Sequence, residues 1–182
     1  MEYQLVKSAA EMQQILTLQK ANLKQYLDAA TKESQGFVTL QHNLSLLQQM
    51  HAVMPSVIAV EGNQLAGYAL SLAIECMPAF PELESMYNSL QNLSFKGLPI
   101  SRQRYYYMGQ ICVDQAFRGQ GVFQGLYQAH ARYFRAQFDV LITEVSPLNK
   151  RSMTAHTKMG FEVIHSYADE SGPWNVIAWD WS

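Results

Sequence analysis

A short glycine-containing turn is the part of the chain with the clearest chemical potential. It reads Arg118-Gly119-Gln120-Gly121 and separates a strand-like segment ending at Val113 from a helical segment beginning near Val122. Glycines allow the backbone to turn tightly and to approach a ligand closely. The first turn of a helix offers unpaired N–H groups and the positive end of the helix dipole. The turn is therefore predicted to bind a phosphate or pyrophosphate, with a charge-assisted hydrogen bond from Arg118.

Two common phosphate-binding motifs fit this turn poorly. No Gly-Lys-Ser/Thr follows it, so it is not a Walker loop. The dinucleotide fingerprint is closer, because Gly119 and Gly121 match its first two glycines and Glu144 ends the next strand, as a ribose-binding acid would. However, position 124 is glutamine and the third glycine is displaced to Gly125. A nucleotide-dependent oxidoreductase stays open as an alternative, and it would bind NAD in preference to CoA.

Two segments together resemble the GNAT superfamily of acetyl-CoA-dependent acyltransferases. That family carries Gln/Arg-x-x-Gly-x-Gly/Ala after its fourth strand, and here residues 118–123 read RGQGVF, with Phe123 at the last position. Residues 149–161 resemble the family's Asn-x-x-Ala…Tyr-x-x-x-Gly-Phe element, with Ser152 for Ala and His156 for Tyr. The resemblance covers residues 105–167 well, and the expected order of elements extends it over the whole chain.

The resemblance implies how the cofactor, acetyl-CoA, would bind. The fourth and fifth strands of the family splay apart, and backbone groups of the fourth strand contact the pantetheine and the thioester. The amides of the glycine turn hold the pyrophosphate, and an asparagine of the following helix touches the pantetheine. The residues that this assigns to the cofactor are Ile111, Cys112, Val113, Arg118, Gly119, Gln120, Gly121, Val122, Phe123, Asn149 and Ser152.

The implied reaction is the attack of a neutral primary amine on a thioester. The amine, with a pKa near ~10, must first lose a proton, and the tetrahedral oxyanion needs a preorganised donor such as a backbone N–H. The family protonates the departing thiolate with Tyr; His156 stands there and titrates near neutrality. Many members carry a glutamate that acts as the general base at the position that Gly109 occupies here. Because glycine cannot accept a proton, the base is sought among Glu75, Glu144 and Asp114. Glu144 ranks first, because it ends the strand beside the expected thioester.

Each of these residues also has an ordinary structural interpretation. Asn149 is equally suited to cap a helix, a role compatible with ligand contact. His156 is as well explained by a structural histidine as by a catalytic one, and Cys112 by a small core residue. Strand-end acids such as Glu144 are more often surface residues than bases. Residues 150–151 are more simply an exposed face than a contact for the 3′-phosphate of CoA.

The elements that must position these residues form an α/β pattern. The strand at 105–113 is apolar on both faces and is therefore expected at the centre of the sheet. The fold class is predicted as a mixed, largely antiparallel sheet with helices on both faces and splayed central strands. The expected strands are 3–6, 56–60, 65–76, 105–113, 140–145, 161–167 and 174–181; the expected helices are 8–27, 39–51, 83–93, 122–134 and 149–158. Ser8 and Glu11 are expected to form a capping box at the start of the first of these helices.

Length and composition restrict the remaining possibilities. The 182 residues predict one domain, and the irregular stretch 77–104 predicts an inserted cap or lid that shapes the acceptor pocket. With a net charge of -2 and no dense basic run, nucleic-acid binding is not expected. Two separated cysteines and the lack of a leader or apolar span indicate a cytoplasmic protein without a metal site. Exposed aromatic strands near the C-terminus are compatible with a homodimer.

The sequence therefore predicts an N-acetyltransferase that acts on an amine of a small molecule or peptide. Because the usual strand-four carboxylate is missing and histidine replaces the family's tyrosine, the alternative is a non-catalytic acyl-CoA-binding or sensing module on the same fold.

Overall fold

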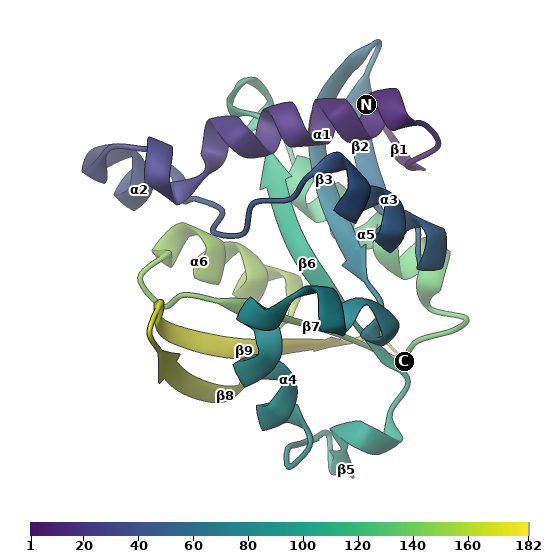
Figure 1. The fold of residues 1–182 in the computed structure, drawn as a ribbon, viewed down its shortest axis with the longest axis vertical. Coiled ribbons are helices and arrows are strands. Elements are labelled where there is room, and N and C mark those ends of the chain that lie inside the picture. The colour runs from purple at the N-terminus through teal and green to yellow at the C-terminus, as the bar shows by residue number, and fades with distance from the viewer. Residues whose placement is uncertain (182) are drawn as a thin grey trace.

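A seven-stranded sheet organises the chain (Figure 1). The computed structural model describes residues 1–181, apart from the side chains of Ala29, Glu33 and Ser34. The strand order is β1-β2-β3-β6-β7-β9-β8, and only β6 and β7 run parallel, which confirms the mixed, largely antiparallel sheet. The strands are β1 (Glu2–Leu5), β2 (Val57–Glu61), β3 (Gln64–Leu72), β6 (Tyr105–Val113), β7 (Val140–Val145), β8 (Glu162–Asp169) and β9 (Gly172–Asp180).

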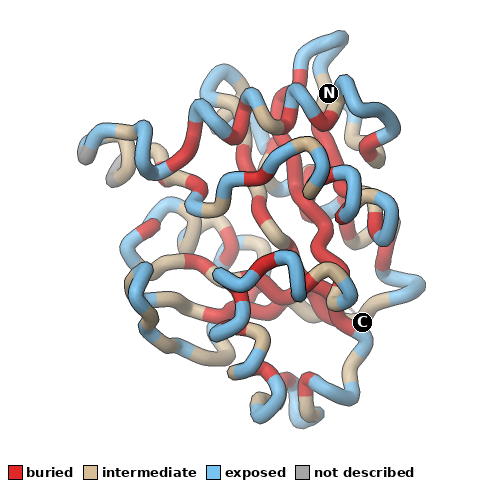
Figure 2. The backbone as a smooth tube through the Cα atoms, in the orientation of Figure 1, coloured by how far each residue is buried: buried red, intermediate tan, exposed pale blue. Residues whose placement is uncertain are grey.

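Helices cover both faces of this sheet and create two hydrophobic cores. One core joins α1 and α3 to β6 through residues such as Ile15, Met50 and Tyr107. The other joins α5 to the opposite face through residues such as Leu126 and Tyr106. The central strands are accordingly the most continuously buried part of the chain (Figure 2). The helices are α1 (Ala9–Asn22), α2 (Ala29–Gln35), α3 (Leu44–Val53), α4 (Glu84–Leu90), α5 (Val122–Phe134) and α6 (Lys150–Met159).

The first helix begins as predicted but ends early. Ser8 and Glu11 form the expected capping box, in which each side chain accepts a backbone N–H of the other. The helix stops at Asn22, and not near residue 27, because Leu23 forms a parallel bridge with Val38. The chain then forms α2, which the sequence did not predict as a separate element. The next helix begins at Leu44 rather than near residue 39, since the Asn43 side chain caps it.

The irregular stretch between β3 and β6 packs onto the α1 side of the sheet. It contains short 3₁₀ turns, α4 and a small hairpin of β4 (Ser94–Phe95) and β5 (Leu98–Pro99). The preceding strand, β3, ends at Leu72, short of the predicted residue 76, because the 3₁₀ turn Ile74–Ala79 begins there. The buried side chains of the stretch between β3 and β6 belong to the same core as α1 and α3: Met77, Phe80, Leu83, Met86, Leu90, Phe95 and Ile100.

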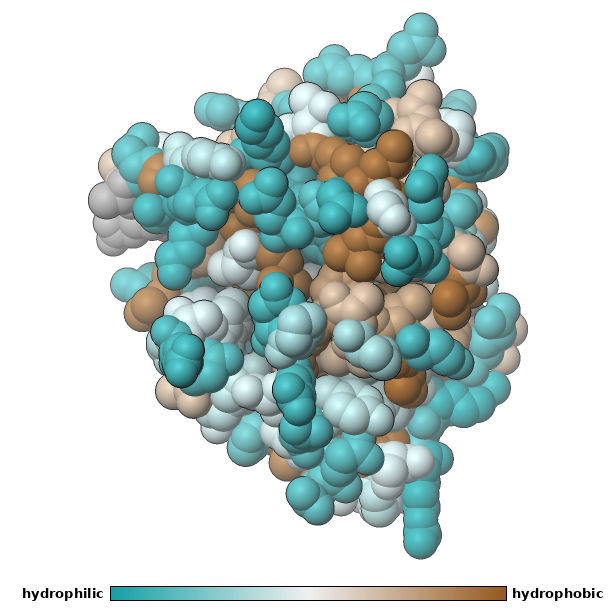
Figure 3. Space-filling model, in the orientation of Figure 1, coloured by the Kyte–Doolittle hydropathy of each residue, from teal (hydrophilic) through white to brown (hydrophobic). Residues whose placement is uncertain are grey.

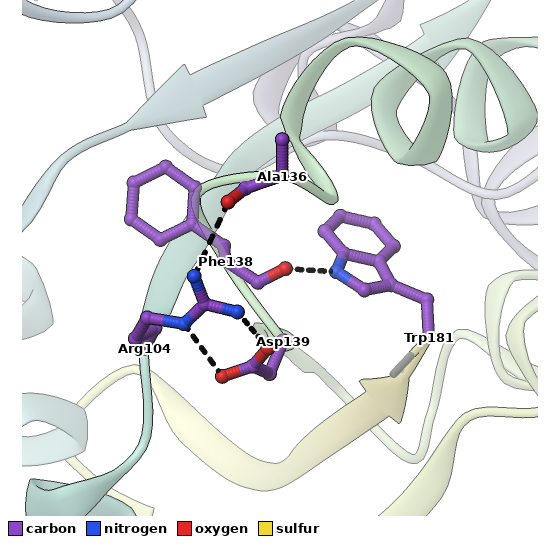
Figure 4. A network of polar contacts seen from close by, with 5 residues as sticks. All are labelled: Arg104, Ala136, Phe138, Asp139 and Trp181. Atoms are coloured by element: carbon purple, nitrogen blue, oxygen red, sulfur yellow. Dashed lines mark hydrogen bonds and ion pairs between the residues drawn. The ribbon is translucent and has the colours of Figure 1, made fainter.

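The parallel pair β6 and β7 is closed at one end and open at the other. Pairing extends only from Tyr105–Tyr107 to Val140–Ile142. The closed end is clamped by Arg104, whose guanidinium bonds both carboxylate oxygens of Asp139 and the carbonyl of Ala136, while Trp181 Nε1 donates to the Phe138 carbonyl at 2.7 Å (Figure 4).

Beyond the paired residues, a side chain replaces the backbone ladder. Thr143 Oγ1 donates to the Met108 carbonyl at 2.9 Å, and the two strands then diverge. The partners of β6 on β3 also shift, because Ser71 pairs with Met108 whereas Leu70 pairs with Gln110. Gly109 is therefore the extra residue of a β-bulge. The splayed central strands predicted for this fold begin at this bulge.

Candidate functional site

A cavity of about 730 Å³ lies at the open end of the splayed strands. Its wall is formed by the end of β6, the start of α5, the segment after α2 and one face of α6. Figure 1 shows α2 and α6 facing each other across this side of the molecule, and the two helices are in contact. In Figure 3, apolar surface gathers mainly near α1 and α3, and polar side chains cover most of the remaining visible face.

The cavity collects most of the residues that the sequence assigned to a cofactor. The predicted residues in its wall are Ile111, Cys112, Val113, Arg118, Gly119, Gly121, Val122, Phe123, Asn149 and Ser152. Gln120 is not among them; it is exposed and its amide donates to the Ala116 carbonyl at 2.9 Å. The wall also contains residues that sequence reasoning missed, among them Asn22, Gln35, Gly36, Phe37, Val38, Phe117 and Lys158.

The glycine turn has the backbone conformation that an anion site needs. Gly119 and Gly121 have φ angles of 78° and 79°, in the left-handed region that favours glycine. Gly121 is the N-cap of α5 and has no side chain to cap the helix, and no other side chain of the described residues caps it. The first N–H groups of α5 therefore face the cavity without an intrahelical acceptor. This geometry suits a diphosphate.

Arg118 does more than add charge to the cavity, because protein acceptors hold its guanidinium. It donates to the Val113 carbonyl at 3.1 Å, to Gln35 Oε1 at 3.0 Å and to Asn22 Oδ1 at 2.7 Å. These acceptors belong to β6, α2 and α1. Gln35 Oε1 also accepts a bond from Arg151 at 3.2 Å, so one amide joins two arginines across the cavity mouth. Arg118 thus ties three elements to the glycine turn.

Replacing Arg118 with lysine is expected to destabilise the protein although the charge is kept. A single ammonium cannot reach three acceptors in the fork geometry of a guanidinium. We expect the free energy of unfolding to fall by about 1–2 kcal/mol and acetyl-CoA to bind more weakly. Chemical denaturation and calorimetry measure both effects, with the exposed Arg135→Lys as control. Equal stability of the two variants would contradict this role.

Asn149 performs the capping role and also anchors the segment that crosses the cavity. Its Oδ1 accepts the Ser152 N–H at 3.2 Å at the start of α6, and its Nδ2 donates to the Phe37 carbonyl at 3.2 Å. A Cβ on Gly36 would lie only 2.9 Å from Asn149 Oδ1, so a side chain at position 36 would disturb this contact. The segment after α2 is therefore held directly against α6.

His156 lies behind the cavity rather than in its wall. Its Nδ1 donates to the Ser152 carbonyl at 2.8 Å, which leaves Nε2 to accept the hydroxyl proton of Tyr127 at 2.6 Å. The ring also packs edge-on against Phe123 and Phe161. Burial lowers the pKa of His156 to about 4, so the imidazole is neutral at pH 7. The prediction that His156 supplies a proton is not supported by this placement, since both nitrogens are engaged and the ring is enclosed.

Glu144 is half-buried on β7 at the diverging part of the strand pair. The hydroxyl of Tyr167, on β8, donates to its carboxylate. Burial raises the pKa of Glu144 to about 7, with a further rise from Asp169 and an opposing effect of the Tyr167 hydrogen bond. Glu144 is not part of the wall of the 730 Å³ cavity. A raised pKa of this kind is common among groups that transfer protons at functional sites.

The other base candidates are less suited to proton transfer. Asp114 accepts the Ala116 N–H at 2.8 Å and so caps a short 3₁₀ turn, and Glu75 is exposed on the segment after β3. A carboxylate at position 109 would also be misplaced, because a Cβ there would lie 3.4 Å from Leu72 Cβ and 3.7 Å from Met50 Cε. The core on the α1 side fills that position with apolar groups.

Comparison with known proteins identifies the family. The sequence pattern of the acetyltransferase (GNAT) family matches residues 23–161, which contain both motifs and the splayed strands. The chain belongs to the GNAT acetyltransferase family. No curated protein matches the sequence. Among the described residues of this GNAT chain, no helix is long and apolar enough to cross a membrane, and no group of three His, Cys, Asp or Glu side chains could hold a metal.

Several solved structures share the fold at low identity. The chain is similar to the ribosomal-protein-S18-alanine N-acetyltransferase from Escherichia coli (TM-score 0.66, 10% identity, 100% of this chain and 94% of that chain). It is also similar to the ribosomal-protein-alanine N-acetyltransferase from Brucella melitensis (0.64, 16%, 99% and 99%) and to Ard1 from Thermoplasma volcanium (0.66, 12%, 99% and 98%). At these identities the likeness concerns the fold of the GNAT chain alone.

Proposed function

We propose that this GNAT protein is an N-acetyltransferase that transfers an acetyl group from acetyl-CoA to a primary amine of a small molecule or peptide. The observation that carries the proposal is the cavity at the open end of β6, entered beside the uncapped start of α5. Amides of residues 119–123 hold the diphosphate, and backbone groups of Ile111 and Val113 line the pantetheine path. The acetyl group comes from the thioester of acetyl-CoA, which the amine attacks directly.

In this proposal Glu144 is the general base. It removes a proton from the amine as the nitrogen–carbon bond forms, directly or through a water. The carbon–sulfur bond then breaks, and the departing CoA thiolate takes up a proton from the protonated Glu144 or from solvent. A pKa near 7 suits this task, because half of the carboxylates are then ionised at neutral pH. Tyr167 orients the carboxylate through its hydroxyl. The segment 77–104 packs on the α1 side of the sheet and is assigned to the acceptor pocket.

Calorimetry and a thiol-release assay test this function together. We expect acetyl-CoA to bind with a dissociation constant on the order of micromolar, equivalent to about -8 kcal/mol. We expect free thiol to appear when amines of a panel that includes peptide N-termini and small polyamines are added. Binding without thiol release from any amine would favour the alternative, a non-catalytic acyl-CoA-binding module. Failure to bind acetyl-CoA would contradict both the N-acetyltransferase hypothesis and the binding-module hypothesis.

His156 is assigned a structural role, and its replacement separates that role from catalysis. His156→Ala removes a buried ring and leaves the Tyr127 hydroxyl without its acceptor. We expect the free energy of unfolding to fall by about 2–4 kcal/mol, while kcat per folded molecule changes less than about threefold. Denaturation and active-site titration measure the two quantities. A large loss of kcat at unchanged stability would restore the proton-donor hypothesis.

A further inference from the structure

The β-bulge in β6 places a glutamine in an unexpected position. Tyr107 faces the α1 side of the sheet and Met108 the α5 side. In a regular strand residue 110 would lie on the same face as residue 108 and point to the α5 side. Gln110 instead lies buried on the α1 side, where its amide reaches α1, β3 and the loop before α3.

The hydrogen bonds of Gln110 are mutually consistent. Its Nε2 donates to the Leu40 carbonyl at 2.9 Å, which fixes the orientation of the amide. Its Oε1 accepts from Gln19 Nε2 at 2.8 Å and from the Tyr68 hydroxyl at 2.6 Å. Exchanging the oxygen and nitrogen would place the NH₂ group against two donors. Only one orientation of Gln110 satisfies all three partners.

Gln19 extends this arrangement to a histidine. Its Oε1 accepts the backbone N–H of His42 at 2.8 Å, so its Nε2 donates both to Gln110 and to His42 Nδ1, the latter at 2.7 Å. The proton of the neutral His42 ring therefore resides on Nε2, which is buried and has no hydrogen-bond partner among the described residues. Burial lowers the pKa of His42 to about 4, so the cluster carries no charge at pH 7.

We propose that Gln110 is a positioning residue that fixes the register of the bulge and thereby the face of β6 that lines the acetyl-CoA cavity. A shift of one residue in a strand exchanges the faces of every following side chain. In β6 it would exchange Ile111 and Val113 with Cys112 along the cavity wall. Three buried hydrogen bonds to three separate segments oppose that shift. This inference rests on the proposed function for its catalytic consequence, but not for its structural one.

The test compares Gln110→Met with a matched glutamine elsewhere. Gln103→Met is the control, since the Gln103 amide also donates to two carbonyls, of Phe95 and Leu98, in the small hairpin away from the cavity. For Gln110→Met we expect kcat to fall about 10- to 100-fold, because a misplacement near 1 Å has that effect. The KM for the amine changes little by comparison. Gln110→Glu retains the acceptor bonds to Gln19 and Tyr68 and should recover part of kcat.

Hydrogen exchange supplies a second readout that does not need turnover. In the wild type and in Gln103→Met, acetyl-CoA is expected to protect the amides of residues 109–113; in Gln110→Met this protection is lost. If Gln110→Met loses stability but keeps wild-type kcat and protection, the positioning role is overturned. If the wild type binds acetyl-CoA without acetylating any amine, the proposed catalysis fails, and the exchange pattern still decides the role of Gln110.

Discussion

Glu144→Gln is expected to reduce kcat by about 100-fold or more while acetyl-CoA binding changes little, because a general base typically contributes a factor of this size. Glutamine has the same shape but cannot accept the amine proton. The wild-type rate should rise with pH through about 7, the pKa of Glu144, since the base acts only when ionised. This rise, the ascending limb of the pH–rate profile, should be absent from the residual activity of the variant. Rate measurements from about pH 5.5 to about pH 9 at saturating substrates decide the point.

Tyr167, the hydrogen-bond partner of Glu144, allows the direction of the shift in the pKa of Glu144 to be tested separately. The Tyr167 hydrogen bond stabilises the carboxylate and so lowers its pKa against the effect of burial. Tyr167→Phe removes that bond, and the ascending limb should move to higher pH. A limb that stays in place, or moves to lower pH, would show that the titrating group is not Glu144.

A measurement of stability shows whether Glu144→Gln is inactive because it misfolds. A carboxyl whose pKa is higher in the folded than in the unfolded protein stabilises the fold when protonated, and this stability is lost as pH rises through the folded value. For Glu144 the loss falls between the ordinary glutamate pKa and about 7. Glu144→Gln should therefore be at least as stable as the wild type at pH 8. An inactive variant with lower stability at that pH would not support the assignment.

The parts of the fold that the sequence predicted are those decided by local chemistry. The capping box at Ser8 and Glu11 and the left-handed glycines at 119 and 121 each depend on residues a few positions apart. The early end of α1 depends on a bridge between Leu23 and Val38, fifteen positions apart, and no local pattern reveals it. For the same reason α2 and its contacts with the cavity were missed.

The predictions for the candidate site also divide into those that depend on nearby residues and those that depend on contacts between distant segments. Ten of the residues that the resemblance assigned to acetyl-CoA lie together in the cavity wall, because they belong to two continuous segments of the chain. The resemblance gave no place to Gln110, since a single polar residue in an apolar strand gives no sign that a bulge redirects it to the core. It also gave no sign that Tyr127, which comes from another helix, donates to the ring of His156. Motif position fixes a backbone path, whereas the environment of a side chain depends on the whole fold.

The second large effect is expected from Gly121→Val, which should weaken acetyl-CoA binding by about 100-fold. With φ at 79°, this position disfavours a β-branched residue by about 1–3 kcal/mol, so the turn must rearrange. Rearrangement moves the first N–H groups of α5 away from the diphosphate. Losing two charge-assisted hydrogen bonds of about 1.5 kcal/mol each weakens binding about 100-fold.

Gly62→Val separates this loss from general strain. Gly62 also has a positive φ, of 59°, and a Cβ there meets nothing within 4 Å, as at Gly121, but it lies in the β2–β3 turn outside the cavity. Both variants should lose similar stability in denaturation, since both force a β-branched side chain into a left-handed conformation. Only Gly121→Val should bind acetyl-CoA more weakly in calorimetry. Equal binding by the two variants would mean that the start of α5 does not hold the diphosphate, and the cavity would then need a different ligand.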